Sequence, residues 1–432
     1  MKKNILAFCL MLLTGFVSAQ NYYFPPNSGS AWEQTDPKSL GWCTDEIPSL
    51  YDYLQSTNTK GIIILKNGKI VVEKYFGTFT KDSLWYWASA GKSMTSALVG
   101  IAHAEGKLNL GDVSSKYLGK NWTALPQNKE DLITIRHQLT MTTGLDDSGD
   151  KDCTTPTCLK YKADAGTRWA YHNAPYTLLD KVIENSTGQT FNQYYSAKVK
   201  VKTGMTGIYV KSGYNNVNYS NLRSFARFGL LMLNKGKWMN EQIVPVDYFD
   251  EIISSSQNIN PSYGYLWWLN GKSRYMLPSS QFVFSGDLLP EAPANTYSAL
   301  GKNGQILNVV PELDLVFVRM GNSDGSPVPT TYNNEIWKRL NKVICESTSI
   351  SDGNTEPNEI KIFPNPAADK IYISSNHPVS QIEKQVVDAL GNTMQIPSND
   401  SFLDVSSLAN GMYFLQCKTE NGVRVLRFLV SH

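Results

Sequence analysis

A polar stretch divides the chain into two folding units. Residues 346–359, ESTSISDGNTEPNE, are acidic, contain helix- and strand-breaking residues and show no apolar period. A segment of this composition is typical of a linker. At 432 residues the chain also exceeds the length of a usual single domain. We therefore expect a large unit over 20–346, a linker over 347–358 and a small unit over 359–432.

The first 19 residues have the composition of a signal peptide. Lys2 and Lys3 precede an uncharged apolar run, Ile5–Phe16, and Val17–Ala19 ends in small residues that suit cleavage. The run is short for a membrane span, and no later segment approaches ~18 apolar residues. We expect an exported protein without a transmembrane segment.

The composition is that of a globular protein with little net charge. Charged residues make up 18% of the chain and the formal net charge is +2. A chain without a polybasic or polyacidic character is not expected to bind nucleic acid.

Export permits disulfides, and five cysteines lie outside the signal sequence: Cys43, Cys153, Cys158, Cys345 and Cys417. Cys153 and Cys158 flank a turn-like Thr-Thr-Pro-Thr, which predicts a local bridge. A zinc site would need further ligands close by, and the sequence places none there. We expect no metal and no cofactor.

The order of strand and helix patterns predicts an α+β fold for the large unit. Residues 61–77 alternate as a hairpin around an Asn-Gly turn, and residues 89–105 have helical spacing. A cluster of strands, which includes an aromatic run over 263–269, is followed by a helix over 332–344. Strands at both ends with helices between them predict one antiparallel sheet packed on a helical region. Behind the linker only short strands appear, which predicts a small all-β sandwich.

The stretch WASAGKSMTS, residues 87–96, contains a candidate nucleophile. Ser89 and Lys92 are three residues apart, so a helix places them on one face, where the amine can accept the hydroxyl proton. The amine can do so only if burial lowers its pKa, and we expect an apolar wall of Leu84, Trp85, Trp87 and Met94 to bury it. The alternative is a helix-capping serine followed by a solvated lysine. A second S-x-x-K match, Ser148–Lys151, lies in a predicted loop and cannot hold this register.

Two further motifs follow along the chain. Residues 166–173, GTRWAYHN, precede a predicted helix, and residues 301–305, GKNGQ, lie between two predicted strands. Together with SAGK, they resemble the S-x-x-K, Y-x-N and K-T-G-like motifs of the serine β-lactamase and penicillin-binding-protein superfamily. The resemblance is to class C β-lactamases and their esterase and amide-hydrolase relatives in particular. It covers roughly residues 44–345 and extends to residues 133–144.

The resemblance implies a role for each matched catalytic residue. Ser89 would be the acylated nucleophile and Lys92 its proton-accepting neighbour. Tyr171 would act as a general base with its phenol held ionised by nearby lysines. His172 is the rival base, but adjacent residues seldom point at the same spot.

The resemblance also implies the groups that bind the substrate. Asn173 would hydrogen-bond the amide or ester flank, and Lys302, Asn303 and Gly304 would form the third motif. The backbone N–H groups of the nucleophile and of Gln305 would form the oxyanion hole. Asn303 stands where β-lactamases have a hydroxyl residue, which favours an esterase, amidase or peptidase over a true β-lactamase.

The function implied is that of an exported serine hydrolase that cleaves an ester or amide of a small molecule or peptide through an acyl-enzyme. The alternatives are a true β-lactamase or D-amino-acid peptidase acting on cell-wall material, and a penicillin-binding sensor that acylates without turnover. Because the terminal helices of this fold lie side by side, the resemblance also implies a Cys43–Cys345 bridge.

The small unit has a resemblance of its own. Residues 363–366, 403–414 and 423–431 resemble the C-terminal sorting domain of type IX secretion substrates. This implies a secreted or cell-surface protein whose tail is recognised by secretion machinery. A carbohydrate-binding or adhesion sandwich is the alternative, but the strands alternate as in a simple core. Removal of the tail would leave four cysteines, which agrees with two disulfides.

Overall fold

The computed structural model describes most of the chain. The described residues are 22–325, 329–345, 360–375, 379–388, 391–399, 402–419 and 422–432. The expected signal peptide over 1–19 and the expected linker over 347–358 lie outside them. Within these ranges no helix is long and apolar enough to cross a membrane.

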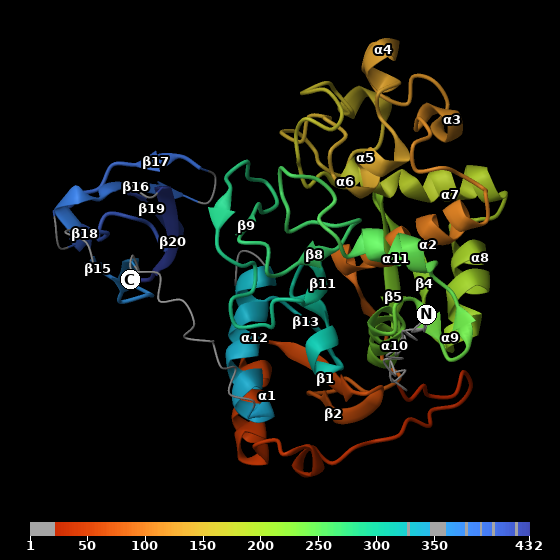
Figure 1. Cartoon of the computed structure of the whole chain (residues 1–432), viewed down its shortest axis with the longest axis horizontal. Helices are drawn as coiled ribbons and strands as arrows, with labels where there is room; N and C mark the ends of the chain where they lie inside the picture. Colours follow the sequence, from red (N-terminus) through yellow and green to blue (C-terminus); the bar gives the residue numbers. More distant parts are fainter. Residues whose placement is uncertain are drawn as a thin grey trace, which may run out of the picture.

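The large unit is built around one antiparallel sheet of six strands in the order β2-β1-β13-β12-β11-β8 (Figure 1). Its strands are β1 (Thr59–Lys66), β2 (Lys69–Tyr75), β8 (Trp268–Leu269), β11 (Tyr297–Gly301), β12 (Gln305–Val310) and β13 (Leu315–Gly321). Strand β1 from the N-terminal part pairs with β13 from the C-terminal part, with Ile63 opposite Val318. The α+β prediction is confirmed.

The turn between β1 and β2 shows why this hairpin forms. Asn67 and Gly68 have φ angles of 53° and 81°, the left-handed conformations that a tight hairpin turn requires and that Asn and Gly accept. A Cβ at Gly68 would lie 1.9 Å from the backbone oxygen of Tyr23. The turn therefore also lets the N-terminal segment pack against the sheet.

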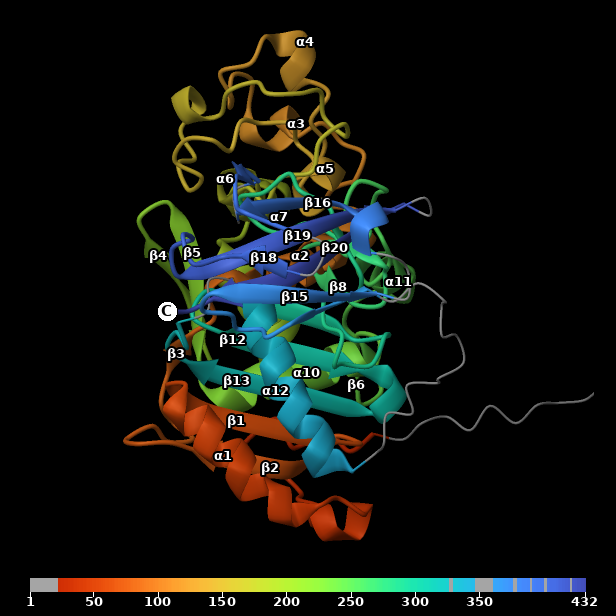
Figure 2. The same cartoon turned by 90° about the vertical axis from the view of Figure 1, so that its left-hand side faces the viewer.

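Helices cover both faces of the sheet. Helices α1 (Ile47–Ser56) and α12 (Pro329–Ile344) lie side by side on one face (Figure 2). Helix α10 (Leu222–Leu233) packs on the other face, where a Cβ at Gly229 would lie 2.4 Å from Val316. Because Gly229 has no side chain, the backbone of α10 can approach the sheet closely at this position.

Both expected disulfides are present. Cys43–Cys345 joins the segments that flank α1 and α12, 302 residues apart in sequence, and Cys153–Cys158 closes a short loop. Cys417 of the tail is buried and unpaired among the described cysteines.

A helical region lies beside the sheet (Figure 1). Its helices are α2 (Gly91–Ala104), α3 (Ser115–Leu118), α4 (Gln127–Glu130), α5 (Ile135–Leu139), α6 (Asn173–Thr177), α7 (Leu179–Thr187), α8 (Phe191–Tyr195), α9 (Val201–Thr203) and α11 (Val246–Ile252). Small sheets are formed by β3 (Trp85–Tyr86), β4 (Ile208–Ser212) and β5 (Asn215–Ser220), by β6 (Lys237–Trp238) and β7 (Glu241–Gln242), and by β9 (Arg274–Tyr275) and β10 (Phe284–Ser285).

The aromatic run over 263–269 differs from its prediction as one strand. Only Trp268 and Leu269 form a strand, β8. Leu266 has a φ angle of 60°, so the chain bends before it enters the sheet. Because of this bend, the side chains before and after Leu266 do not alternate as in one strand. Trp267 is fully buried.

The tail is all-β, as predicted. One sheet has the order β14-β15-β18 and the other β17-β16-β19-β20. The strands are β14 (Ile360–Phe363), β15 (Lys370–Ser375), β16 (Glu383–Asp388), β17 (Thr393–Met394), β18 (Phe402–Asp404), β19 (Gly411–Thr419) and β20 (Gly422–Val430). Ile371, Leu415 and Phe428 are fully buried in its core.

Candidate active site

Ser89 lies on a tight turn that is anchored in the core. The turn is a 3-10 helix, Ala88–Ala90, directly ahead of α2, so the predicted helix begins two residues after Ser89. Trp87 before it is fully buried, and its indole N–H donates to Ser220 Oγ at 2.7 Å. The turn is therefore held from the protein interior and directs Ser89 outward, into a cavity.

Ser89 and Lys92 meet as the spacing predicts. Lys92 Nζ lies 3.0 Å from Ser89 Oγ and donates a hydrogen bond to it. The hydroxyl is thus engaged by the lysine, and the residue at the N-cap of α2 is Ala90, which makes no side-chain capping bond. Ser89 therefore does not cap α2 with its side chain, and Lys92 is buried beside it rather than solvated.

Lys92 is buried, with a side chain 3% exposed. Burial lowers the pKa of Lys92 to about 7, and the carboxylate of Asp152 acts in the opposite direction. The ammonium lies 4.0 Å from the ring centroid of Tyr176 and 5.1 Å from that of Tyr171. Two tyrosines far along the chain therefore cover the amine, whereas Leu84, one of the neighbours expected to bury it, is 56% exposed.

Tyr171 stands beside this pair. It lies in the extended segment before α6, and its ring stacks on Trp268 with centroids 5.7 Å apart. Burial raises the pKa of Tyr171 to about 12, although a hydrogen bond with Ser89 lowers it. The phenol is therefore protonated at neutral pH, whereas the motif resemblance implied an ionised phenol.

His172 is separated from this chemistry. Burial lowers the pKa of His172 to about 4, and the charges that act on it include those of Asp147, Asp146 and Arg168. Arg168 and Asp147 form an ion pair of 2.6 Å. His172 is not among the residues that line the cavity at Ser89.

The cavity at Ser89 measures about 260 Å³. It is lined by Ser89, Tyr171, Trp268, Leu277, Pro278, Ser279, Leu300, Gly301, Lys302, Pro329 and Thr330. Sequence reasoning did not assign the apolar members of this set. For Trp268 there was a signal, because it belongs to the aromatic run over 263–269, which could line a substrate groove.

The third motif approaches Ser89 through its first residues. A Cβ at Gly301 would lie 2.4 Å from the carbonyl oxygen of Trp87 and 3.1 Å from the backbone nitrogen of Ala90. The end of β11 therefore packs directly on the Ser89 turn, and Lys302, which is exposed, follows at the cavity wall.

The later residues of that motif point elsewhere. Asn303 and Gly304 have φ angles of 64° and 67°, so the hairpin turns here. Asn303 Nδ2 donates to the hydroxyl of Tyr86 at 2.7 Å. Gln305 begins the return strand, is fully buried, and its side-chain amide donates to the carbonyl of Gly321 at 2.7 Å. The structure thus brings Gly301 and Lys302 to the nucleophile, and it does not bring Gly304 and Gln305 there.

Asn173, the last residue of the second motif, sits at the start of α6. Its Nδ2 donates to Asp152 Oδ1 at 2.7 Å, while its buried Oδ1 has no hydrogen-bond partner within the described part of the chain. Asp152 directly precedes the Cys153–Cys158 loop. The disulfide loop therefore positions the side chain of Asn173.

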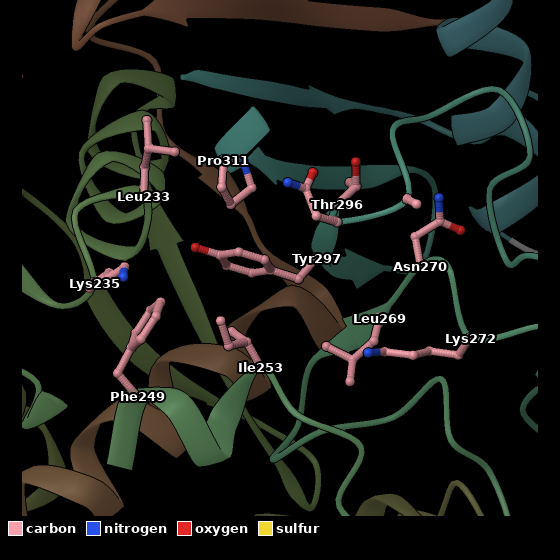
Figure 3. Close-up of a pocket in the computed structure, with 12 residues that line it drawn as sticks. Leu233, Lys235, Phe249, Ile253, Leu269, Asn270, Lys272, Thr296, Tyr297 and Pro311 are labelled. Carbon is pink, nitrogen blue, oxygen red and sulfur yellow. The ribbon is translucent and has the colours of Figure 1, made fainter. Parts of the chain in front are cut away.

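A second cavity of about 280 Å³ lies at the opposite end of β11 (Figure 3). Phe249, Ile253 and Leu269 form its apolar wall. The Tyr297 hydroxyl donates its proton to the carbonyl of Met232 at 2.8 Å, so this proton is not free to bond a ligand. None of the lining residues of this second cavity is a serine, cysteine or histidine, whereas the cavity at Ser89 contains a serine beside a buried lysine. Among the described residues, no group of three or more His, Cys, Asp and Glu side chains could hold a metal ion.

Comparison with known families agrees with this geometry. Residues 52–341 match the family model described as Beta-lactamase. The chain belongs to the β-lactamase family. Residues 361–431 match the secretion system C-terminal sorting domain, so this β-lactamase-family chain carries a sorting domain behind its hydrolase fold.

Curated relatives of this β-lactamase-family chain are distant. An uncharacterized protein of Alkalihalophilus pseudofirmus is 29% identical over 315 residues, which are 64% of this chain and 88% of that protein. The teichoic acid D-alanine hydrolase of Staphylococcus aureus is 28% identical over 158 residues. That match covers 34% of this chain and only 40% of the hydrolase.

Solved structures share the β-lactamase-family fold at low identity. A putative 6-aminohexanoate-dimer hydrolase from Bacillus anthracis has a TM-score of 0.56 at 19% identity, covering 75% of this chain and 89% of that chain. EstCE1, a hydrolase with promiscuous acyltransferase activity, has a TM-score of 0.53 at 13% identity, covering 70% of this chain and 99% of that chain. These likenesses establish the fold.

Proposed function

We propose that this chain is an exported serine hydrolase that cleaves an ester or amide of a small molecule or peptide through a Ser89 acyl-enzyme. The observation that carries the proposal is the 3.0 Å contact between Ser89 Oγ and the buried Nζ of Lys92. A lysine whose pKa is about 7 is partly neutral at physiological pH, and only the neutral amine has a lone pair to take the hydroxyl proton.

Acylation then proceeds with Lys92 as the base. Ser89 Oγ gives its proton to Lys92 and bonds to the acyl carbon, and the carbonyl electrons move to oxygen. When the tetrahedral intermediate collapses, the bond to the leaving alkoxide or amine breaks. Tyr171, protonated at neutral pH, donates a proton to the departing group and regains one from Lys92. Water hydrolyses the acyl-enzyme by the same steps in reverse order.

The oxyanion hole follows from the contact between β11 and the Ser89 turn. We assign the backbone N–H groups of Ser89 and Lys302, because Gly301 packs on the turn and Lys302 lines the cavity. Gln305, the residue expected from motif matching, lies in the buried return strand instead. Preorganised N–H donors of this kind stabilise the developing oxyanion.

The walls of the cavity favour an acyl group without a carboxylate. Trp268, Leu277, Pro278 and Leu300 make much of the lining apolar, and the amide of Asn303 is occupied by Tyr86. A β-lactamase or D-amino-acid peptidase would need a group that receives the substrate carboxylate; Lys302 and Thr330 line the cavity, but the third motif has Asn303 where β-lactamases have a hydroxyl residue. We therefore place an esterase or amidase first, and hydrolysis of D-alanyl esters, suggested by the teichoic acid D-alanine hydrolase, second.

Location and partner follow from the sorting domain and from the signal-peptide pattern. We propose export through the signal peptide over 1–19 and recognition of residues 361–431 by type IX secretion machinery. The hydrolase would then act outside the cell or at its surface.

The test uses the mature chain, residues 20–432, as wild type and as Ser89→Ala, Lys92→Ala and Tyr171→Phe. Ser148→Ala is the matched control, since it removes the serine of the other S-x-x-K match. Each is incubated with a p-nitrophenyl ester, nitrocefin, a D-alanyl ester and a D-Ala-D-Ala peptide, and intact mass is recorded. We expect the wild type to turn over the ester and to form an acyl adduct. Ser89→Ala should abolish both, and Ser148→Ala should abolish neither.

Other outcomes decide between the alternatives. Turnover of nitrocefin or of the peptide in preference to the esters would establish the β-lactamase or peptidase alternative. A stable adduct without turnover would identify an acylating sensor. Ester turnover that survives in Ser89→Ala would refute the assignment of the nucleophile.

A further inference from the structure

One sheet of the sorting domain has two buried faces. In β19, Tyr413 and Leu415 lie in the core of the tail, whereas Met412 and Phe414 belong to the apolar core of the hydrolase unit. Successive side chains of a strand point to opposite faces. The face that carries Met412 and Phe414 is therefore an apolar surface that the tail's own core does not use, and the prediction of a simple core alternation captured only the other face.

The neighbouring strands extend this surface. Val387 of β16 is buried in the same hydrolase core, and Val425 and Leu429 of β20 pack against it. We call these residues, with Met412 and Phe414, the docking face. A contiguous apolar face on a small domain normally marks an interaction site.

The docking face lies against the rim of the catalytic cavity. The ring of Phe414 is 4.4 Å from that of Phe284 and 6.1 Å from that of Phe282, measured between centroids. Arg427 Nη1, on the same face of β20 as Leu429, donates to Thr331 Oγ1 at 3.0 Å. In Figure 1 the tail lies beside the β9 hairpin and α12, the two elements that carry these partners.

Both contacted segments also line the cavity. Phe282 and Phe284 follow the lining residues Leu277–Ser279, and Thr331 follows the lining residues Pro329 and Thr330. One wall of the cavity is thus formed by segments whose outer side rests on the sorting domain.

The start of this wall is firmly held, because Met276 and Leu277 are buried in the hydrolase core and Asn260 hydrogen-bonds the backbone of Met276, but the residues after Leu277 have fewer supports. Between the two-residue strands β9 and β10 the chain has no regular structure, and Ser279 has a φ angle of 65°. Hydrogen bonds that join residues 278–283 to the rest of the hydrolase unit include Lys151 Nζ to Ser279 Oγ and Gln281 Nε2 to the carbonyl of Trp169 at 3.0 Å. Exposed segments without regular structure open locally at low free energy, so the aromatic contact of Phe284 with Phe414 adds a restraint to this one.

We propose that the sorting domain is an intramolecular partner of the hydrolase, which docks through this face on the cavity rim and holds the wall formed by Leu277–Ser279 and Pro329–Thr330. The partner of the docking face is the aromatic pair Phe282 and Phe284 of the same chain. The effect of docking on selectivity rests on the proposed function. When the sorting domain is not docked, this wall can move outward, and the enzyme accepts longer acyl groups.

The test uses the full mature chain and the variants Phe414→Ala and Arg427→Ala. Tyr372→Ala is the matched control, since this aromatic residue lies on β15 of the other sheet and is 43% exposed. Hydrogen exchange of residues 276–285 is followed by mass spectrometry. The ratio of kcat/KM for p-nitrophenyl octanoate to that for p-nitrophenyl acetate is measured alongside.

We expect exchange in 276–285 to be at least threefold faster in Phe414→Ala, and the octanoate-to-acetate ratio to rise at least threefold. Arg427→Ala should shift both in the same direction by less, and Tyr372→Ala should match the wild type. Unchanged exchange in Phe414→Ala, with the exchange pattern of the tail intact, would overturn the docking. Faster exchange with an unchanged ratio would overturn its effect on selectivity. If the wild type cleaves neither ester, the proposed function and the selectivity fail together, and the exchange result still decides the docking.

Discussion

The two walls of the catalytic cavity are built in different ways. The Ser89 wall consists of a turn anchored by buried Trp87, a buried helix and the end of a central strand. The opposite wall consists of the Leu277–Ser279 segment and the start of α12, and it rests on the sorting domain. Chemistry needs positions held within fractions of an ångström, whereas selectivity tolerates a wall that moves. Under the proposed function, the firmly anchored wall carries the reacting groups and the other wall affects selectivity.

Of the substitutions considered, removal of the proposed base, Lys92, should lower the activity most. In Lys92→Met the side chain keeps its length and loses the amine, so no group accepts the Ser89 proton. We expect kcat/KM for a p-nitrophenyl ester to fall by about 10³-fold, within the usual range for a general base. Lys107→Met, at an exposed lysine just after α2, is the control. A loss below tenfold would show that another group takes the proton.

A methyl group between the strand and the turn should displace the oxyanion hole. A Cβ at Gly301 would lie 2.4 Å from the Trp87 carbonyl oxygen, so the end of β11 must shift in Gly301→Ala. We expect kcat to fall by about 10²-fold, comparable to the loss of one oxyanion donor. Gly111→Ala, where nothing lies within 4 Å of the added carbon, is the control. Wild-type kcat in Gly301→Ala would refute the assignment of Lys302 to the oxyanion hole.

The opposite wall should respond in KM rather than in kcat. Lys151→Met removes the amine that donates a hydrogen bond to Ser279, a residue of this wall. We expect KM to rise severalfold with kcat within twofold, because the reacting groups stay in place. The exposed Lys160→Met nearby is the control. A fall in kcat that exceeds the rise in KM would contradict the division between the two walls.

The pH dependence of kcat/KM tests the lowered pKa of Lys92. Because burial lowers the pKa of Lys92 to about 7, the amine is protonated and inactive below that pH. We therefore expect kcat/KM to rise with pH through about 7 and then to level off. The Asp152 carboxylate raises this pKa, so Asp152→Asn should move the midpoint to lower pH, by no more than about one unit. A midpoint that moves to higher pH would contradict this electrostatic role.

Local patterns were read correctly because they depend on residues close in sequence. Helical spacing put Ser89 and Lys92 on one face, and the Asn67-Gly68 turn defined the first hairpin. The third motif was harder to place. Its residue types matched the family, but the hairpin turns at Asn303 and Gly304, so Gln305 lies in the return strand and Lys302 at the cavity. A sequence pattern does not specify which residue of a turn faces a segment more than 200 positions away.

The family, the α+β fold class and the contact between Ser89 and Lys92 could be predicted from the sequence, because each depends on local spacing and composition. The tertiary structure decided what covers Lys92, which end of the third motif reaches Ser89, and what the second face of β19 contacts. These features arise where Tyr176, Gly301 and Phe414 meet segments far away in the chain. They follow from the packing of whole elements against one another, which the period of any single element does not encode.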